Sequence, residues 1–187
     1  MKRWLAVFLV LIIVGSLLAA CSSKTPAVTP EDVNSPDHAE HIVTIDKVIE
    51  ALQNPDDWVV IDVRTAEEFN GESRLPNAFG TGRLKGAVNV DKNLAFDADG
   101  KRLTNDELVK LYDFIGDKKV IAYCHGGARS KDIWEILTDL GFDTWHYDDS
   151  WIDWSRAASV AEGGSDDVVL GLTEKWTDNE GVIEVPG

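Results

Sequence analysis

The sequence predicts a single domain of the α/β class, in which a parallel sheet carries helices on both faces. Two apolar runs, 58–63 and 119–123, are nearly continuous, which is typical of strands buried on both faces of a sheet. Segments with the apolar spacing of helices alternate with these runs, and this alternation favours parallel pairing. A chain of 187 residues is long enough to bury one core of this kind. We expect the domain to cover residues 41–160.

The first half of the domain begins with a strand, a helix and a second strand. Residues 42–43 are predicted as a short strand, residues 45–52 as an amphipathic helix, and residues 58–63 as the first buried strand. Thr65 and Glu68 have the spacing of a capping box, which predicts a short helix directly after this strand.

The second half repeats the order of strand and helix after a stretch that is rich in glycine and asparagine. Within that stretch, residues 70–100, only residues 87–90 are predicted as a strand. A second capping box, Thr104 with Glu107, predicts the start of a helix. The remaining predicted elements are a strand over 119–123, a helix over 131–140 that ends at Gly141, a strand over 144–147 and a short helix over 151–158.

The N-terminal residues have the features of an export signal. Basic Lys2 and Arg3 precede an apolar stretch over 4–18, which predicts a signal peptide over residues 1–20. The following Leu-Ala-Ala-Cys, ending at Cys21, resembles the lipobox of bacterial lipoprotein precursors, which implies a membrane anchor of acyl chains on Cys21. An uncleaved membrane helix with an incidental Cys21 is the alternative. Both interpretations place the domain in the cell envelope, facing the periplasm or the exterior.

Composition limits the partners of the chain. The formal net charge is −15, so the surface as a whole repels nucleic acid, and no nucleic-acid partner is expected. Residues 21–40, rich in Ser, Thr, Pro and acidic residues, are predicted as a lipidated cysteine with a flexible tether. Residues 161–187 are predicted as an acidic C-terminal tail, ordered in part at most.

The second of the two cysteines, Cys124, is the candidate nucleophile. With Cys21 assigned to lipid, no intramolecular disulfide is possible, and a free thiol outside the cytoplasm suggests chemical use; a buried structural cysteine is the alternative. Cys124 follows a buried strand and precedes a helix, which places its sulfur at the carboxyl edge of the sheet, where α/β proteins bind ligands. Loop N–H groups and the helix N-terminus favour an anion there, and therefore the reactive thiolate.

The residues around Cys124 support this anion site. Gly126 and Gly127 let the backbone turn inward, and Arg129 adds a fixed positive charge. The remaining loop residues, which complete the predicted binding loop, are His125, Ala128 and Ser130.

Cys124-x-x-Gly127-x-Arg129-Ser130 after a buried strand resembles the active-site loop of the rhodanese family, the thiosulfate and mercaptopyruvate sulfurtransferases. The resemblance extends over residues 42–158. Residues 62–64 with 67–69 resemble the family's D-x-R…E-F signature, residues 82–89 its G-H-I-P-G-A-x-N segment, and residues 147–154 its Y-D-G-S-W-x-x-W stretch. Arg83 and Lys85 depart from the family pattern, which usually has His and Pro there.

The resemblance implies a rhodanese-like α/β domain that moves sulfane sulfur through a persulfide on Cys124, with Arg129 as the second catalytic residue. Small sulfur donors and acceptors are the expected partners, with a protein sulfur acceptor as a further one; no cofactor and no metal are implied. Arg74 and Arg83 are candidates for the pocket rim. Asp62 and Arg64 are expected to form a structural pair.

Three alternatives remain at the level of sequence. Related phosphatases and arsenate reductases need one more residue between Cys and Arg than the four found here, which favours sulfur transfer. A carrier that holds a persulfide for a partner protein without turnover is the main rival, and a lipoprotein with a vestigial site is the third. His38 and His41 could form half a metal site, but solvated polar residues are the simpler interpretation. Trp151 and Trp154 are expected to pack in the core.

Overall fold

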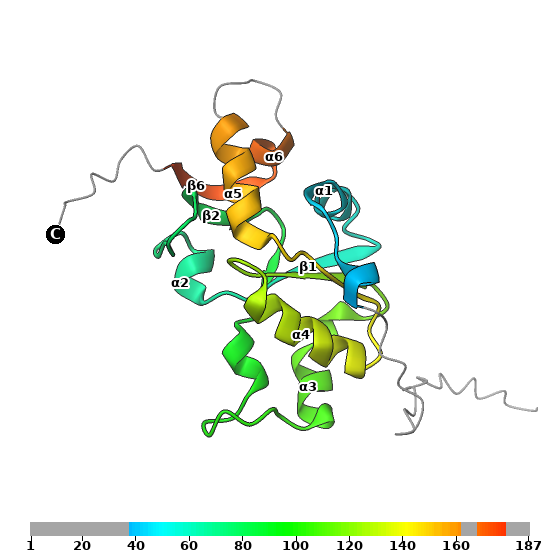
Figure 1. Cartoon of the computed structure of the whole chain (residues 1–187). Coiled ribbons are helices and arrows are strands. Elements are labelled where there is room, and N and C mark those ends of the chain that lie inside the picture. The colour runs from blue at the N-terminus through cyan, green and yellow to red at the C-terminus, as the bar shows by residue number, and fades with distance from the viewer. Residues whose placement is uncertain (1–37, 162–167, 179–187) are drawn as a thin grey trace, which may run out of the picture.

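The computed structural model describes residues 38–161 and 168–178 (Figure 1). The predicted signal peptide, the lipidation site Cys21 and most of the predicted tether lie outside the described residues. Within the described ranges, no helix has the length and apolar character needed to cross a membrane.

A four-stranded parallel sheet forms the centre of the domain, as predicted. The strands lie in the order β3-β1-β4-β5, and each neighbouring pair is parallel. The predicted strand at residues 42–43 is reduced to one bridge, in which Ile42 pairs with His146. The bounds are β1 Trp58–Asp62, β3 Val88–Asn89, β4 Lys119–Tyr123 and β5 Thr144–His146.

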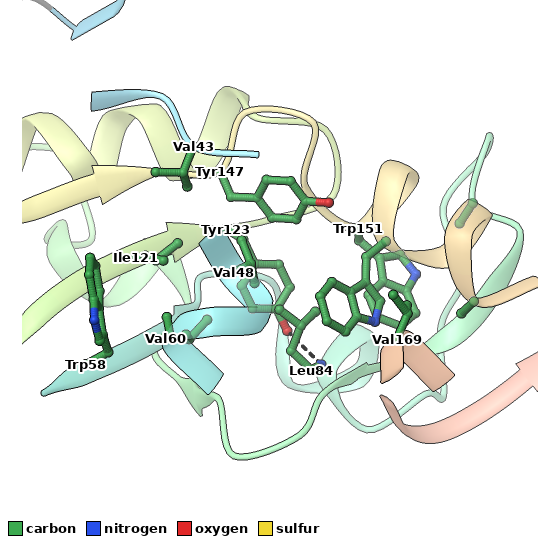
Figure 2. Close-up of a cluster of buried hydrophobic side chains, with 14 residues drawn as sticks. Val43, Val48, Trp58, Val60, Leu84, Ile121, Tyr123, Tyr147, Trp151 and Val169 are labelled. Carbon is green, nitrogen blue, oxygen red and sulfur yellow. Dashed lines mark hydrogen bonds between the residues drawn. The ribbon is translucent and has the colours of Figure 1, made fainter. Parts of the chain in front are cut away.

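Helices cover both faces of this sheet, which confirms the predicted fold class. α1 and α5 lie on one side of the strands and α3 and α4 on the other (Figure 1). Successive strand residues point to opposite faces, so Val60 packs toward α1 while Ile61 packs toward α4. Figure 2 shows the core on the α1 side. The helix bounds are α1 Ile45–Gln53, α2 Ala66–Phe69, α3 Asn105–Leu111, α4 Ala128–Asp139, α5 Ser150–Ala161 and α6 Val168–Gly171, with short 3-10 helices η1 His38–His41, η2 Lys92–Ala95 and η3 Asp113–Ile115.

The helix starts follow the predicted capping chemistry. The Thr65 side chain accepts a hydrogen bond from the Glu68 backbone N–H, and the Glu68 side chain accepts one from the Thr65 backbone N–H. Thr104 and Glu107 form the same reciprocal pair at α3. α4 begins at Ala128, three residues before the predicted start, because the loop after Cys124 turns directly into the helix.

The structure also contains a second sheet of two strands, which the sequence-based prediction did not include. β2 (Gly80–Leu84) pairs antiparallel with β6 (Thr173–Asp178), which lies in the predicted C-terminal tail. Because β2 is rich in glycine, its sequence did not predict a strand. The close approach of β6 nevertheless requires glycine in β2. A Cβ at Gly80 would lie 2.6 Å from the ring of Trp176 and from the Thr177 carbonyl oxygen. Part of the predicted tail therefore packs on the domain.

Candidate active site

The loop that carries Cys124 is fixed between the sheet and two helices. Cys124 follows β4 directly, and the start of α5 holds the loop by two backbone bonds. Trp151 N–H donates to the Cys124 carbonyl oxygen at 3.1 Å, and Ile152 N–H donates to that of His125 at 3.0 Å. Gly127 has φ +87°, and a Cβ there would lie 2.3 Å from a carboxylate oxygen of Asp148. The close approach and the positive φ both require glycine at this position.

The sulfur of Cys124 is buried, and two hydroxyl groups lie near it. The residue is 1 % exposed, and its Sγ lies 3.4 Å from Ser130 Oγ and 4.0 Å from Ser150 Oγ. Ser150 also accepts a bond from the Cys124 backbone N–H at 3.1 Å and donates to the Tyr147 carbonyl oxygen at 2.7 Å. Its own φ is +54°, a conformation that the bonds on both sides maintain. The N-terminus of the 12-residue helix α4 faces the same sulfur, so the position favours an anion.

Arg129 is held by a partner that the sequence-based prediction did not assign. Its two terminal nitrogens donate to the two carboxylate oxygens of Glu68 at 2.7 and 2.9 Å. Those bonds raise the pKa of Arg129, and the charge of Cys124 raises it further. Burial acts to raise the pKa of Glu68, but the bonds and charge of Arg129 outweigh burial and lower it. Glu68 appeared in the sequence only as a capping residue and part of a motif.

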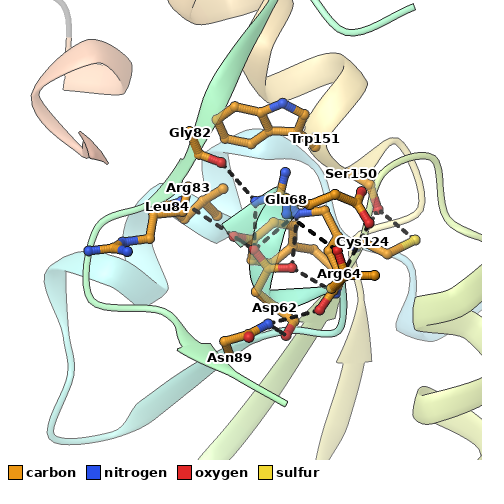
Figure 3. Close-up of polar contacts among 12 residues, drawn as sticks. Asp62, Arg64, Glu68, Gly82, Arg83, Leu84, Asn89, Cys124, Ser150 and Trp151 are labelled. Carbon is orange, nitrogen blue, oxygen red and sulfur yellow. Dashed lines mark hydrogen bonds and ion pairs between the residues drawn. The ribbon is translucent and has the colours of Figure 1, made fainter. Parts of the chain in front are cut away.

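A buried polar network around Asp62 and Arg64 lies next to the Cys124 loop (Figure 3). Arg64 pairs with Asp62 at 2.7 Å, with side chains 2 % and 0 % exposed, and it donates to the Gly82 carbonyl oxygen at 2.8 Å. Tyr123 donates its hydroxyl to Asp62, and Asn89 donates to the carbonyl oxygens of Asp62 and Arg64. Because four strands contribute to this network, it fixes the sheet edge on which Cys124 stands. The predicted structural pairing of Asp62 with Arg64 is confirmed.

A cavity of about 430 Å³ opens beside the sulfur. Its walls are mainly apolar, and Arg129 is its only charged lining residue within the described chain. His125 Nε2 donates a hydrogen bond to the Pro76 carbonyl oxygen at 2.8 Å, which joins the Cys124 loop to the opposite wall of the cavity. The lining residues are Leu75, Pro76, Asn77, Cys124, His125, Gly126, Ala128, Arg129 and Ile152.

The two arginines predicted for the pocket rim do not line this cavity. Arg83 lies on β2, where it pairs with Glu174 at 3.0 Å and stacks over Phe69 at 4.4 Å from its ring centre. The partner strand β6 was not predicted, so this pairing could not be foreseen. Arg74 precedes the wall residue Leu75 but is not itself a lining residue.

Two tryptophans and two histidines that the sequence singled out pack against other side chains. Trp151 and Trp154 are buried in the core, as predicted. His38 and His41, expected as solvated polar residues, are half-buried, and their rings pack against Trp134 with centroids 4.5 and 6.1 Å away. Over residues 38–161 and 168–178, no three His, Cys, Asp or Glu side chains are grouped so that they could hold a metal ion.

The arrangement is suited to a nucleophilic sulfur that carries a second sulfur. A thiolate at Cys124 can attack an electrophilic atom in the cavity. The loop N–H groups, the α4 N-terminus and the Ser130 hydroxyl then stabilise the negative charge of the product.

Curated relatives match a little over half of the chain. The protein provisionally named thiosulfate sulfurtransferase SseA of Mycobacterium tuberculosis is 36 % identical in an alignment of 110 positions, which covers 54 % of this chain and 37 % of the relative. A relative from Haloferax volcanii, provisionally named a thiosulfate sulfurtransferase, is 37 % identical in an alignment of 116 positions, which covers 56 % of this chain and 41 % of the relative. This chain therefore spans less than half the length of these relatives.

Solved structures and a family model agree with this likeness. The anaerobic ergothioneine biosynthesis enzyme from Chlorobium limicola, bound to trimethyl histidine, matches at a TM-score of 0.59 and 25 % identity, over 65 % of this chain and 31 % of that one. EanB, with ergothioneine linked to a cysteine persulfide, matches at a TM-score of 0.58 and 25 % identity, over 63 % of this chain and 30 % of that one. The model of the rhodanese-like domain matches residues 44–157. The chain belongs to the rhodanese-like domain family.

Proposed function

We propose that this protein is a sulfurtransferase that moves a sulfane sulfur from a donor to a thiophilic acceptor through a persulfide on Cys124. The observation that carries the proposal is the position of the Cys124 sulfur at the wall of the cavity, within reach of two hydroxyls and at the α4 N-terminus. Four residues separate Cys124 from Arg129. The short loop fits one added sulfur atom.

The first half-reaction loads the cysteine. The Cys124 thiolate attacks the outer sulfur of the donor, and a new S–S bond forms to Cys124. The bond between that sulfur and the rest of the donor breaks, and its electron pair leaves with the donor fragment. This fragment is sulfite from thiosulfate, or a thiolate from an organic persulfide. The negative charge moves onto the outer sulfur, where the loop N–H groups stabilise it.

The second half-reaction returns the cysteine to its starting state. An acceptor nucleophile attacks the outer sulfur, the S–S bond to Cys124 breaks, and the electron pair returns to Cys124 as thiolate. Arg129, paired with Glu68, contributes positive charge close to the sulfur in both steps. The two half-reactions predict ping-pong kinetics.

Three classes of donor fit the proposed reaction. The mycobacterial and haloarchaeal relatives are named for thiosulfate, and EanB carries a cysteine persulfide. Thiosulfate, organic persulfides and polysulfides are therefore the donors to compare. A protein acceptor that docks on this domain is the main alternative to a small acceptor.

The test is the mass of the full-length chain, purified in detergent, before and after each donor, with Cys124→Ser as the control. We expect a gain of one sulfur atom on the wild type alone, and its release by cyanide or a thiol over many turnovers. A stable adduct without turnover would favour a carrier that serves a partner protein. Absence of an adduct with every donor would refute sulfur transfer.

We further propose that acyl chains on Cys21 anchor the mature protein to a membrane of the cell envelope. The support is the basic, apolar and Leu-Ala-Ala-Cys pattern of residues 1–21. Incorporation of labelled palmitate by the wild type and not by Cys21→Ser tests the proposal. A labelled Cys21→Ser protein, or an unlabelled wild type, would contradict it.

A further inference from the structure

A chain of hydrogen bonds joins the catalytic sulfur to two histidines that sulfur transfer, as described, does not use. Ser130 Oγ lies 3.4 Å from Cys124 Sγ and 2.9 Å from His146 Nε2. His146 Nδ1 lies 2.8 Å from Nε2 of His38. The chain therefore runs from the Cys124 loop through α4 and β5 to η1.

The surroundings of His146 favour the neutral imidazole. Its side chain is fully buried, and burial lowers its pKa below the ordinary 6.5. The titratable and charged groups that face it are His38 from η1, Asp148 from the turn after β5 and Lys131 from α4. A neutral imidazole donates from one nitrogen and accepts at the other. The direction of one bond therefore determines the direction of the next.

The acceptors around Nε2 determine which nitrogen of His146 carries the hydrogen. The Gly127 carbonyl oxygen lies 3.1 Å from His146 Nε2, and a carboxylate oxygen of Asp148 lies 3.9 Å from it. Neither group can donate, so the hydrogen belongs on Nε2. Nδ1 then accepts a bond from His38, whose ring is stacked on Trp134 and His146 with centroids 4.5 and 5.0 Å away.

The Ser130 hydroxyl has one hydrogen and two competing acceptors. The Gly127 carbonyl oxygen lies 2.9 Å from Ser130 Oγ, closer than Cys124 Sγ at 3.4 Å. When His146 donates from Nε2 to the carbonyl and to Ser130 Oγ, the hydroxyl hydrogen can point to the sulfur. Without that donor, the shorter bond to Gly127 takes the hydrogen. A hydroxyl that donates to sulfur favours thiolate or persulfide over the protonated form.

We propose that His146 is a positioning residue for Cys124, and that His38 holds it in the tautomer that turns the Ser130 hydroxyl toward the sulfur. The inference rests on Cys124 being the reacting sulfur, as proposed above, and is independent of the donor. Its readout, the ionisation of the sulfur, needs no sulfur donor. Failure of this inference can therefore be distinguished from failure of sulfur transfer.

Two amide variants separate this role from packing. The amide nitrogen of a glutamine can reach the place of Nε2, whereas that of an asparagine reaches only the place of Nδ1. The full-length chain in detergent is alkylated with uncharged iodoacetamide over a range of pH, and the mass of the Cys124 peptide gives the rate. For His146→Asn we expect the pH profile to move up by about one unit, so that alkylation below the midpoint is about tenfold slower. His146→Gln should recover at least half of this shift.

His38 provides a second variant outside the buried core. His38→Ala should move the profile in the same direction, with about threefold slower alkylation, about half a unit. His41→Ala is the matched control, because His41 lies in the same turn and its ring packs on Trp145 with centroids 4.9 Å apart. We expect its profile to match the wild type. Circular dichroism confirms that each variant is folded.

Two results would overturn the proposal. Unchanged profiles for His146→Asn and His38→Ala would show that the histidines do not act on the sulfur. Equal shifts for the asparagine and glutamine variants would show that packing, and not the donor at Nε2, matters. If His146→Asn does not fold, the pH profiles of His38→Ala and His41→Ala test the proposal in its place. Equal profiles for these two variants would overturn it.

Discussion

Replacement of Glu68 by glutamine tests how Arg129 is held beside the sulfur. The substitution keeps the shape of the side chain but removes the charge that pairs with Arg129 through bonds of 2.7 and 2.9 Å. A broken buried pair costs about 3–5 kcal/mol and an exposed pair at most about 1 kcal/mol. The Glu68 side chain is 5 % exposed and that of Arg129 27 %. We therefore expect an intermediate loss of about 2 kcal/mol, or roughly 6 °C in Tm.

The same substitution should slow loading of the sulfur. Arg129 without its partner can turn away from the cavity, and a misplaced catalytic group commonly costs about tenfold or more. Stopped-flow loading of Cys124 and thermal unfolding measure the two effects. Glu67→Gln is the matched control, since the Glu67 side chain is exposed and lies next in sequence without bonding to Arg129. Equal loading rates in the two variants would refute the role of Glu68.

The pH dependence gives a further check on this pair. The pKa of Glu68 in the folded protein lies below 4.5. A carboxyl with a depressed pKa stabilises the folded state above the unfolded value, and this stability is lost as the pH falls through the folded value. The difference in free energy of unfolding between wild type and Glu68→Gln should therefore be complete at neutral pH and shrink below about pH 4.5.

Three further substitutions and conditions follow from the same structure. Gly127→Ala should abolish loading and destabilise the fold, because its Cβ would meet Asp148 at 2.3 Å; wild-type loading would contradict the account of the loop. Arg64→Met should cost about 3–5 kcal/mol in chemical denaturation, since it leaves Asp62 charged and buried, and a loss below about 1 kcal/mol would contradict the network. Burial lowers the pKa of His146 in the folded protein, so on acidification the unfolded state takes up a proton on this histidine before the folded state does. The free energy of unfolding should therefore fall as the pH drops from 6.5 toward the pKa of His146 in the folded protein. His146→Gln should remove that part of the slope in denaturation at several pH values.

Local signals explain why most of the fold could be predicted from sequence. Strands β1 and β4 are apolar runs, and two capping boxes mark the starts of α2 and α3 within four residues each. The Cys124 loop was found in the same way, because its position between a strand and a helix is itself a local pattern.

Contacts between distant segments explain what the sequence did not reveal. Glu68 and Arg129 meet across 61 residues, and Arg83 and Glu174 across 91. Each of these residues has an ordinary local role in the sequence, as a helix cap or a surface charge. The strand pairing of β2 with β6 was hidden for the same reason, and with it the position of Arg83 away from the cavity.

The histidine chain is a third case of this kind. His38 lies in a polar segment that resembles a linker, 108 residues before His146, and no local pattern connects the two. Only the fold brings them to one hydrogen-bonded path behind Ser130.

A single turnover with a donor that carries a labelled sulfane sulfur tests directly whether Cys124 accepts and releases the transferred sulfur atom. The wild-type chain is mixed with the donor, digested under non-reducing conditions, and its Cys124 peptide examined for label and mass. We expect one labelled sulfur per chain on Cys124, lost on addition of a thiol acceptor and absent from Cys124→Ser. Label on another residue, or none on the wild type with thiosulfate, persulfide or polysulfide, would contradict it.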